Sequence, residues 1–455
     1  MKFVNRHSEQ ERLKNTLSKD RSAFVVLYGR RRCGKSTLLK RILEPNDIYF
    51  MADQTEASYQ RTLFANVIEK VIQGFSNVIY PNWQVLFDNL NNRISQRITI
   101  CLDEFPYLVK SAPELPSVLQ KILDNKEELR FNLVLCGSSQ QLMHGLVLDS
   151  SAPLFGRADE IMKIKPMRAA YLQEVLECSA IETVEEYSVW GGVPRYWELR
   201  KEENSLEDAL KYHVFSSLGI LYDEPMRLFL DDMRDTVHSF TILSLIASGC
   251  HRLSEIAARL GKPATSLTAP LDKLLMLGYL EKEIPFGENP KKSKKSLYKI
   301  ADPFIRFYFQ FVVPNRSFIE VEQVSPILHQ LNLQFGMYIS SQWEQLCRDT
   351  VPFLKIDGIE FGKAARWWTG SRDEQTEIDV VAESLDGQYI LVGECKWSDK
   401  TLNIERLFCD LRQKATRLSF VDKREIIYCM FLKNKTLSSE GLIFTAEDII
   451  HTVIK

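Results

Sequence analysis

The chain has 455 residues, which is more than one hydrophobic core usually organises, so about three domains are expected. Hydrophobic residues make up 45% and charged residues 26% of the sequence, proportions that are ordinary for a globular protein. The formal net charge of -2 excludes a chain that is cationic throughout, so any nucleic-acid surface must be a local patch.

A phosphate-binding loop is the first motif along the chain. Residues 23–28 form a continuously apolar run that is typical of a buried parallel strand, and residues 36–43 have helical spacing. The order strand, G-x-x-x-x-G-K-S, helix is the context that this motif requires. The segment is predicted to bind the phosphates of a nucleotide through Gly29, Arg30, Arg31, Arg32, Cys33, Gly34, Lys35, Ser36 and Thr37.

The chemistry of each loop position follows from its residue type. Gly29 and Gly34 let backbone N–H groups turn inward around phosphate oxygens, and the helix N-terminus adds its partial positive charge. Lys35 is expected to reach the β- and γ-phosphates and Ser36 to bind Mg²⁺. We therefore expect a nucleoside triphosphate and Mg²⁺ as cofactors.

A second apolar strand, residues 98–102, is followed by two acidic residues. Asp103 is predicted to hold Mg²⁺ together with its water shell, and Glu104 to polarise the water that attacks the γ-phosphate. An acidic pair after a strand is common by itself, but downstream of a phosphate-binding loop it indicates hydrolysis of the nucleotide.

Two further positions have alternative interpretations. Ser138 follows the apolar run 131–136 and could sense the γ-phosphate, or it could belong to a polar turn that caps the next helix. Arg157 lies in a loop and is either an arginine finger that acts on a neighbouring copy or an ordinary surface arginine. The first alternative for Arg157 would require a homo-oligomer.

Alternating strands and helices predict a parallel α/β core over residues 1–165. Residues 166–232 are rich in Leu, Glu and Tyr with helical spacing and are predicted to form a helical lid that carries the turn at 191–196.

Residues 233–312 have the rhythm of a winged helix-turn-helix. Helices are expected at 239–248, 252–260 and 264–277, followed by hairpin strands at 279–284 and 297–300. Lysines at the hairpin tip suit contacts with DNA phosphates, but such a module can also bind proteins, with the lysines only keeping the loop soluble. The candidate DNA-binding residues are Lys291, Lys292, Lys294 and Lys295. Pro270 is expected to kink the third helix, which counts against reading of bases.

Residues 313–455 begin a new pattern that contains an acidic hairpin. Strands are predicted at 377–382 and 389–397, which would bring Asp379 alongside Glu394, with Lys396 on the same face as Glu394. Two carboxylates and a lysine suit metal-dependent hydrolysis of a phosphodiester, in which Asp379 and Glu394 bind Mg²⁺ and Lys396 orients or deprotonates the water. A solvated hairpin face without a function is the alternative.

Taken together, these motifs resemble the prokaryotic archaeal-type ATPases within the AAA+/STAND group. The matching segments are residues 3–6 with Glu9, 29–37, 100–108, 133–143, 153–157 and 191–196. The resemblance implies that the nucleotide is ATP, and that the first of these segments and Pro194 lie near the adenine.

The Asp…Glu-x-Lys pattern resembles the PD-(D/E)xK nuclease superfamily, a domain that archaeal-type ATPases commonly carry at the C-terminus. This resemblance implies that Glu344 is a further metal ligand, although such folds can also keep the residues and serve only to bind. The expected fold is α/β: a P-loop NTPase core with a helical lid, a winged helix-turn-helix and a C-terminal restriction-endonuclease-like domain.

The leading functional prediction is a Mg²⁺-dependent ATPase whose nucleotide state controls DNA binding or cleavage. The alternative is a nucleotide-switch scaffold that binds protein partners and has an inactive nuclease fold. The first residues are too polar for a signal peptide, and no apolar run approaches the ~20 residues of a membrane helix. We therefore expect a soluble cytoplasmic protein without membrane contacts.

Overall fold

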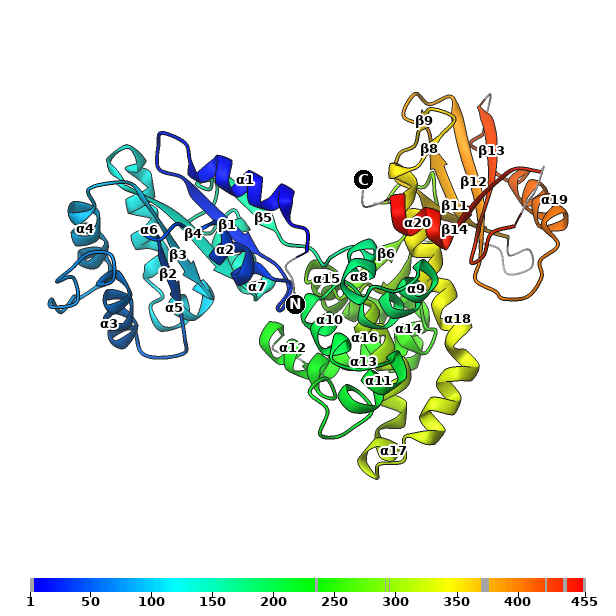
Figure 1. Ribbon diagram of the computed structural model, residues 1–455, viewed down its shortest axis with the longest axis horizontal. Coiled ribbons are helices and arrows are strands. Elements are labelled where there is room, and N and C mark those ends of the chain that lie inside the picture. The colour runs from blue at the N-terminus through cyan, green and yellow to red at the C-terminus, as the bar shows by residue number, and fades with distance from the viewer. Residues whose placement is uncertain are drawn as a thin grey trace. The chain divides into compact units, whose positions relative to one another are not determined.

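The fold is described from a computed structural model (Figure 1). The structure describes residues 4–233, 236–290, 292–293, 295–369, 376–421, 424–436 and 440–452. Lys291 and Lys294, two of the predicted DNA-binding residues, lie outside these ranges. Contacts divide the chain into an N-terminal unit, Phe3–Pro166 with Leu230–Asp232, and a C-terminal unit that holds Met167–Phe229 and Met233–Lys455.

A five-stranded parallel sheet forms the centre of the N-terminal unit. Its order is β2-β3-β4-β1-β5, and every neighbouring pair runs parallel, so the carboxyl ends of all strands meet at one edge. Strands β3 and β4 are buried along their whole length, which explains their continuous apolar runs. The strands are β1 Phe24–Tyr28, β2 Ile48–Met51, β3 Ile98–Asp103, β4 Phe131–Gly137 and β5 Glu160–Lys163.

Amphipathic helices cover this sheet and complete its core. Phe64 of α3 packs against Trp83 and Phe87 of α4, with ring centroids 6.1 and 5.9 Å away. Asn82 caps α4 by accepting a hydrogen bond from the Val85 N–H. The helices are α1 His7–Leu17, α2 Lys35–Ile42, α3 Ala57–Ile68, α4 Trp83–Arg93, α5 Phe105–Ser111, α6 Leu115–Asp124 and α7 Gln140–Met143, with a π-helical turn at His144–Leu148.

The C-terminal unit begins with a set of helices in the predicted lid region. They are α8 Ala169–Leu176, α9 Ala180–Trp190, α10 Pro194–Lys201, α11 Leu206–His213 and α12 Glu224–Asp232. Ser179 and Glu182 form a capping box at the start of α9. Helix α9 packs against α8 and against three helices from later in the chain, α16 (Pro303–Phe307), α18 (Ser325–Thr350) and α20 (Ala446–Thr452). The three parts that the sequence predicts separately after residue 165 therefore form one unit.

Three helical segments and a two-stranded sheet follow the lid region. They are α13 Thr236–Ala247, α14 Leu253–Leu260, a 3₁₀ turn at Ala264–Leu267, α15 Thr268–Met276, β6 Leu280–Glu283 and β7 Leu297–Ile300. The expected third helix is interrupted close to Pro270. That helix is split at Thr268, and Pro270 lies in the first turn of α15, where a missing N–H breaks no helical hydrogen bond.

The tip of the β6–β7 hairpin packs against the last domain of the chain, whose mixed sheet includes Arg366. The Phe286 N–H donates to the carbonyl of Arg366 at 2.9 Å, and the Phe286 ring lies 5.2 Å from the Phe420 ring. A Cβ at Gly287 would approach the Phe420 ring to 3.3 Å, so a side chain there would be crowded as well as strained by the positive φ of 81°. The hairpin is thus part of a packed interface.

The aromatic run after the hairpin forms core helices. They are α16 Pro303–Phe307, a π-helical turn at Tyr308–Val312, α17 Arg316–Glu320 and the long α18 Ser325–Thr350. Phe304, Phe307 and Phe311 are fully buried, which agrees with the interpretation of this run as core. Among the described residues, no helix combines the length and apolar character needed to cross a membrane.

A mixed five-stranded sheet forms the C-terminal domain. Its order is β10-β11-β12-β13-β14, antiparallel up to β12 and parallel beyond it. Helix α19 connects β12 to β13 and packs Phe408 and Leu411 into the core of the sheet. The elements are β8 Lys355–Ile356, β9 Ile359–Glu360, β10 Ala365–Trp368, β11 Glu377–Glu383, β12 Tyr389–Lys396, α19 Ile404–Ala415, β13 Glu425–Leu432, β14 Leu442–Thr445 and α20 Ala446–Thr452.

Candidate functional site

The loop between β1 and α2 has the backbone conformation of a phosphate cradle. Gly29 has a φ of 149°, and a Cβ at this position would lie 2.4 Å from the carbonyl oxygen of Ile164. Gly34 has a φ of 85° and caps α2. Both positions therefore require glycine, and the cradle ends on a helix N-terminus that favours negative charge.

Lys35 folds back over this loop. Its Nζ donates to the carbonyl of Gly29 at 2.7 Å and to that of Arg30 at 3.0 Å. The side chain is almost fully buried, so its charge lies inside the cradle where nucleotide phosphates would be neutralised. Arg31 donates to the Tyr107 hydroxyl at 2.6 Å, which ties the loop to α5.

Ser36 and Asp103 meet at the carboxyl edge of the sheet. The Ser36 hydroxyl donates to Asp103 Oδ2 at 2.6 Å, and the Tyr49 hydroxyl donates to the same oxygen at 2.5 Å. Burial pushes the pKa of Asp103 upward, but hydrogen bonds from Cys136, Ser36, Tyr49 and the Glu104 N–H outweigh it and hold the pKa below its usual value. A hydroxyl beside an ionised carboxylate fits the oxygen ligands that Mg²⁺ prefers.

Glu104 is held in place by Ser138. The Ser138 hydroxyl donates to Glu104 Oε1 at 2.6 Å, and the Ser138 N–H donates to Oε2 at 3.3 Å. Glu104 itself has a φ of 53°, a left-handed conformation that costs energy for a side chain other than glycine and is typical of functional sites. The structure therefore places Ser138 on the carboxylate that is predicted to activate water.

Replacing Ser138 with alanine is expected to lower the kcat of ATP hydrolysis about tenfold and to leave ATP affinity nearly unchanged. The reason is that Glu104 loses a charge-assisted hydrogen bond that fixes its orientation. Steady-state turnover and nucleotide binding measured in parallel check this. Ser139→Ala is the matched control, because the Ser139 hydroxyl accepts a long, 3.4 Å bond from the Leu142 N–H and does not contact Glu104 in the described part of the chain. A Ser138→Ala variant with normal kcat would contradict a positioning role.

The segment before α1 reaches the nucleotide loop through Arg6. This buried side chain donates to the carbonyl of Cys33 at 3.2 Å and to that of Lys165 at 2.6 Å, and it pairs with Glu9 at 2.7 Å. Arg6 and Glu9 both belong to the N-terminal segment that resembles the archaeal-type ATPases.

The predicted place of Pro194 near the adenine stays a prediction. Pro194 is the first residue of α10, in the C-terminal unit.

Arg157 is engaged with its own chain. Its guanidinium forms two hydrogen bonds with Asp124, at 2.7 and 3.2 Å, and a third with the carbonyl of Pro153. Asp124 ends α6 and Arg157 precedes β5, so the pair lies toward the amino ends of the strands, whereas the nucleotide loop follows the carboxyl end of β1. Neither alternative for Arg157 is decided by this placement.

The predicted acidic hairpin brings its charged residues together. The Cys395 N–H donates to Asp379 Oδ2 at 2.9 Å, next to the ladder pair Val380–Gly393. Lys396 Nζ lies 2.7 Å from Glu394 Oε1, and Lys414 of α19 contacts the same carboxylate at 2.8 Å. Asp379, Glu394 and Lys396 therefore converge, and Lys414 adds a cation that the sequence pattern did not indicate.

A carboxylate cluster surrounds Asp379. Glu344 of α18, Glu377 and Asp379 each place one carboxylate oxygen so that all three atoms lie within 4.8 Å of one another. Burial, together with the charges of Glu344 and Glu394, raises the pKa of Asp379 to about 7. Three oxygens at this spacing fit a divalent cation, which would relieve the repulsion between the carboxylates.

Two arginines connect the carboxylate cluster to the hairpin strand β6. Arg366 pairs with Glu377, and Arg348 lies 3.7 Å from Glu344 and donates to the carbonyl of Asp379 at 2.9 Å. Both arginines also contact Glu283 of β6, at 3.3 Å from Arg366 and 3.7 Å from Arg348.

The fold and the loop of the N-terminal unit define a P-loop nucleoside triphosphatase. Residues 3–199 match an ATPase domain found predominantly in Archaea, and residues 308–407 match archaeal and bacterial proteins of unknown function. An uncharacterized protein of Methanocaldococcus jannaschii, MJECL04, is 31% identical over 98% of this chain and 99% of its own length. The chain therefore belongs to the family of archaeal-type ATPases.

Two further similarities are more limited. The Walker-type ATPase paby2304 of Pyrococcus abyssi has a TM-score of 0.53 at 20% identity and covers 68% of this chain and 96% of its own, which shows a shared fold. An uncharacterized ATP-binding protein of Methanocaldococcus jannaschii, MJ0423, is 44% identical over 46 residues, which are 10% of this chain and 78% of that protein.

Several residues of these sites escaped the sequence analysis. Glu377 carried a usable signal, because it lies two positions before Asp379 on a strand and therefore shares its face. Tyr49, Arg348 and Lys414 come from separate elements that only the fold brings to the sites.

Proposed function

We propose that this ATPase uses its nucleotide cycle to control a metal-dependent DNA-cleaving site in the C-terminal domain. The observation that carries the proposal is the convergence of Glu344, Glu377 and Asp379 beside Lys396. These residues belong to the same unit as the three helical segments and the hairpin between residues 236 and 300. Three carboxylates and a lysine suit metal-dependent hydrolysis of a phosphodiester.

The nucleotide site supplies the switch. Lys35 and the loop N–H groups would bind the phosphates, while Ser36 and Asp103 would hold Mg²⁺, which supplies neutralisation of the phosphate charge. Glu104, oriented by Ser138, would accept a proton from the attacking water. The pairing of Arg157 with Asp124 would have to open for Arg157 to act on a neighbouring copy in a homo-oligomer.

The C-terminal site would hydrolyse a phosphodiester. Glu344, Glu377 and Asp379, with Glu394 beside them, would hold a divalent cation that supplies charge neutralisation at the scissile phosphate. Lys396 would orient the water. The oxygen of this water would form the new bond to phosphorus as the bond to the leaving oxygen breaks. The proton that the water loses would pass through solvent to the leaving oxygen.

DNA is the proposed partner of the hairpin tip as well. Lys292 is exposed and Lys295 is largely exposed, although Lys295 pairs with Glu288 at 2.6 Å. Because Phe286 fixes the tip on the C-terminal domain, DNA held by these lysines would be bound by the same body that carries the carboxylate cluster.

Replacing Asp379 with asparagine is expected to abolish Mg²⁺- or Mn²⁺-dependent DNA cleavage by the full chain, a loss of about 100-fold or more. Lys396→Ala is expected to reduce cleavage to a similar degree. Asp386→Asn is the matched control, because Asp386 caps the exposed β11–β12 turn and lies outside the cluster. Cleavage that survives in both Asp379→Asn and Lys396→Ala would assign the activity to another site or to a contaminant.

A nucleotide-switch scaffold without nuclease activity is the second candidate. It is favoured by the ion pairs that already neutralise the carboxylates: Arg366 on Glu377, Arg348 on Glu344, and two lysines on Glu394. Calorimetric titration with Mn²⁺ separates the two functions. A scaffold would show no binding that depends on Asp379.

A further inference from the structure

A large cavity lies within the C-terminal unit, next to the carboxylate cluster. Its volume is about 940 Å³. Its walls come from the start of α14, strand β7, helices α16 and α18, and strand β10. Glu344 and Glu377, two members of the carboxylate cluster, line it directly. Two of the three carboxylates of the cluster are therefore accessible from the cavity.

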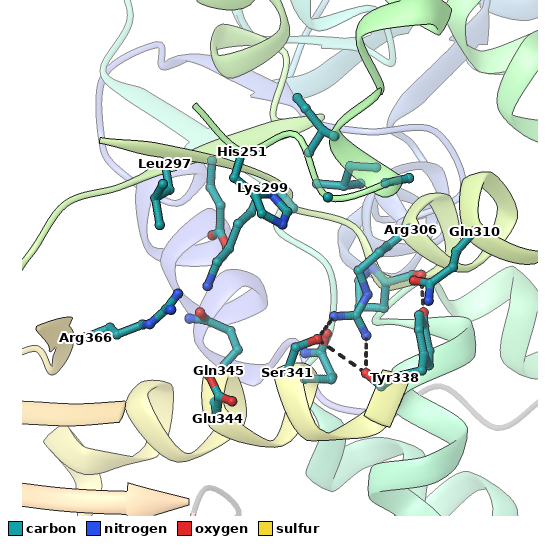
Figure 2. Close-up of a pocket in the computed structure, with 18 of the residues that line it drawn as sticks. His251, Leu297, Lys299, Arg306, Gln310, Tyr338, Ser341, Glu344, Gln345 and Arg366 are labelled. Atoms are coloured by element: carbon teal, nitrogen blue, oxygen red, sulfur yellow. Dashed lines mark hydrogen bonds between the residues drawn. The ribbon is translucent and has the colours of Figure 1, made fainter. Parts of the chain in front are cut away.

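Cationic side chains from separate elements face this space. Figure 2 shows Lys299 and Arg366 pointing toward one another near Gln345, with Glu344 beside them. At the other end, Arg306 lies 4.1 Å from the centre of the Tyr338 ring, donates to the Tyr338 carbonyl at 3.1 Å and contacts Ser341. An arginine fixed over an aromatic ring is a platform of the kind that holds nucleobases and phosphates.

Five acidic residues line the same cavity: Glu255, Glu281, Glu344, Asp349 and Glu377. Burial raises the pKa of Glu281 and Asp349, which favours their neutral forms. Glu344 and Glu377 belong to the carboxylate cluster, whose charge a divalent cation would offset. The cations that line the cavity include Lys299, Arg306, Lys363 and Arg366. Lys299 and Arg366 both pair with Glu283, and Arg366 also pairs with Glu377. A metal bound at the carboxylate cluster would take up part of this negative charge and leave these cations able to contact a phosphate.

The size of the cavity selects among nucleic-acid ligands. Pockets of ~300–1,000 Å³ bury one drug-sized molecule, which corresponds to roughly one or two nucleotides. An intact duplex presents two paired strands, and its bases must be unpaired before they can enter a pocket of this kind.

We propose that this cavity binds one or two unpaired nucleotides at the end of a single strand and presents their phosphodiester to the carboxylate cluster. The proposal rests on the proposed function and adds its substrate class: a frayed or single-stranded end rather than a closed duplex. The Lys299 and Arg366 end of the cavity contacts the phosphate, and the Arg306–Tyr338 end contacts the base.

The test uses the full chain with Mg²⁺ and a fluorescein-labelled, twelve-nucleotide single-stranded thymidylate, with closed circular plasmid DNA as competitor. Arg306→Gln is expected to weaken binding of the oligonucleotide about tenfold. Lys363→Gln is expected to weaken it less, and because Lys363 is exposed its replacement leaves folding intact. Arg412→Gln is the matched control. Arg412 lies on α19 and pairs with Glu440 outside the cavity, so binding should be unchanged.

The proposal is overturned if Arg306→Gln and Lys363→Gln bind the oligonucleotide as the parent chain does, or if closed plasmid competes as well as single strands of equal mass. Cleavage is scored separately with Asp379→Asn. Binding that depends on Arg306, without cleavage that depends on Asp379, would support the nucleotide-binding cavity and contradict the proposed nuclease function. Cleavage of closed plasmid that depends on Asp379 but is unchanged in Arg306→Gln would support the proposed nuclease function and contradict the role of the cavity.

Discussion

Replacing Glu104 with glutamine is expected to lower ATP turnover by about 100-fold or more while ATP still binds. Glutamine keeps the shape of the side chain but cannot accept a proton, and general bases contribute ~10²–10⁴-fold. The binding groups, Lys35 and the P-loop backbone, are untouched by this change. Single-turnover hydrolysis and equilibrium ATP binding are the measurements.

Two further variants serve as comparisons for Glu104→Gln. Lys35→Ala is expected to lose ATP binding itself, because the cradle loses its buried cation. Glu114→Gln, at the exposed start of α6, should hydrolyse ATP normally. Unchanged turnover in Glu104→Gln would show that another group activates the water, and unchanged turnover in Lys35→Ala would remove the P-loop assignment.

The largest effect on stability is expected at Glu283. This side chain is 12% exposed and contacts three cations: Lys299 at 2.8 Å, Arg366 at 3.3 Å and Arg348 at 3.7 Å. Glu283→Gln keeps the shape but leaves buried positive charge without its carboxylate. The free energy of unfolding of the C-terminal unit should fall by about 3 kcal/mol.

The sign of the pH dependence follows from the same contacts. Burial pushes the pKa of Glu283 upward, but Lys299 and the two arginines outweigh it, so the pKa lies below its usual value. The stabilisation is therefore present above the ordinary glutamate pKa and is lost as the pH falls through the lowered folded-state value. In Glu283→Gln this part of the acid sensitivity should disappear.

Tryptophan fluorescence during chemical denaturation measures this effect in the intact chain. Of the seven tryptophans, only Trp83 lies in the N-terminal unit, so the signal reports mainly on the C-terminal unit. Glu288→Gln is the control, since the contacts of Glu288 among the described residues are an ion pair with Lys295 and a hydrogen bond with Ser293, both near the surface. A loss under about 1 kcal/mol in Glu283→Gln would mean that the cations find other partners.

The residues predicted for the nucleotide site lie together in the structure because they are local in the sequence. The P-loop lies within nine consecutive positions, and Asp103 and Glu104 directly follow a buried strand, so parallel strand order alone brings them to the same edge. Asp379 and Glu394 could be paired for a similar reason, since a short turn fixes the hairpin register.

The remaining contacts depend on tertiary packing that no local pattern encodes. Arg348 and Arg366 reach Glu283 only because α18, β10 and β6 pack together. The expected third helix is interrupted near Pro270, but the sequence did not show that a 3₁₀ turn at Ala264–Leu267 precedes α15, because helix starts are poorly marked when no polar cap is present.

The docked hairpin has a practical consequence for dividing the protein into fragments. A truncation at residue 312 would remove Phe420 and Arg366, so Phe286 would be exposed to solvent and Glu283 would keep only Lys299 of its three cations. Such a fragment would expose apolar surface, which promotes aggregation, and would leave the charge of Glu283 only partly neutralised. Residues 236–300 are therefore expected to be stable only together with the domain against which the hairpin tip packs.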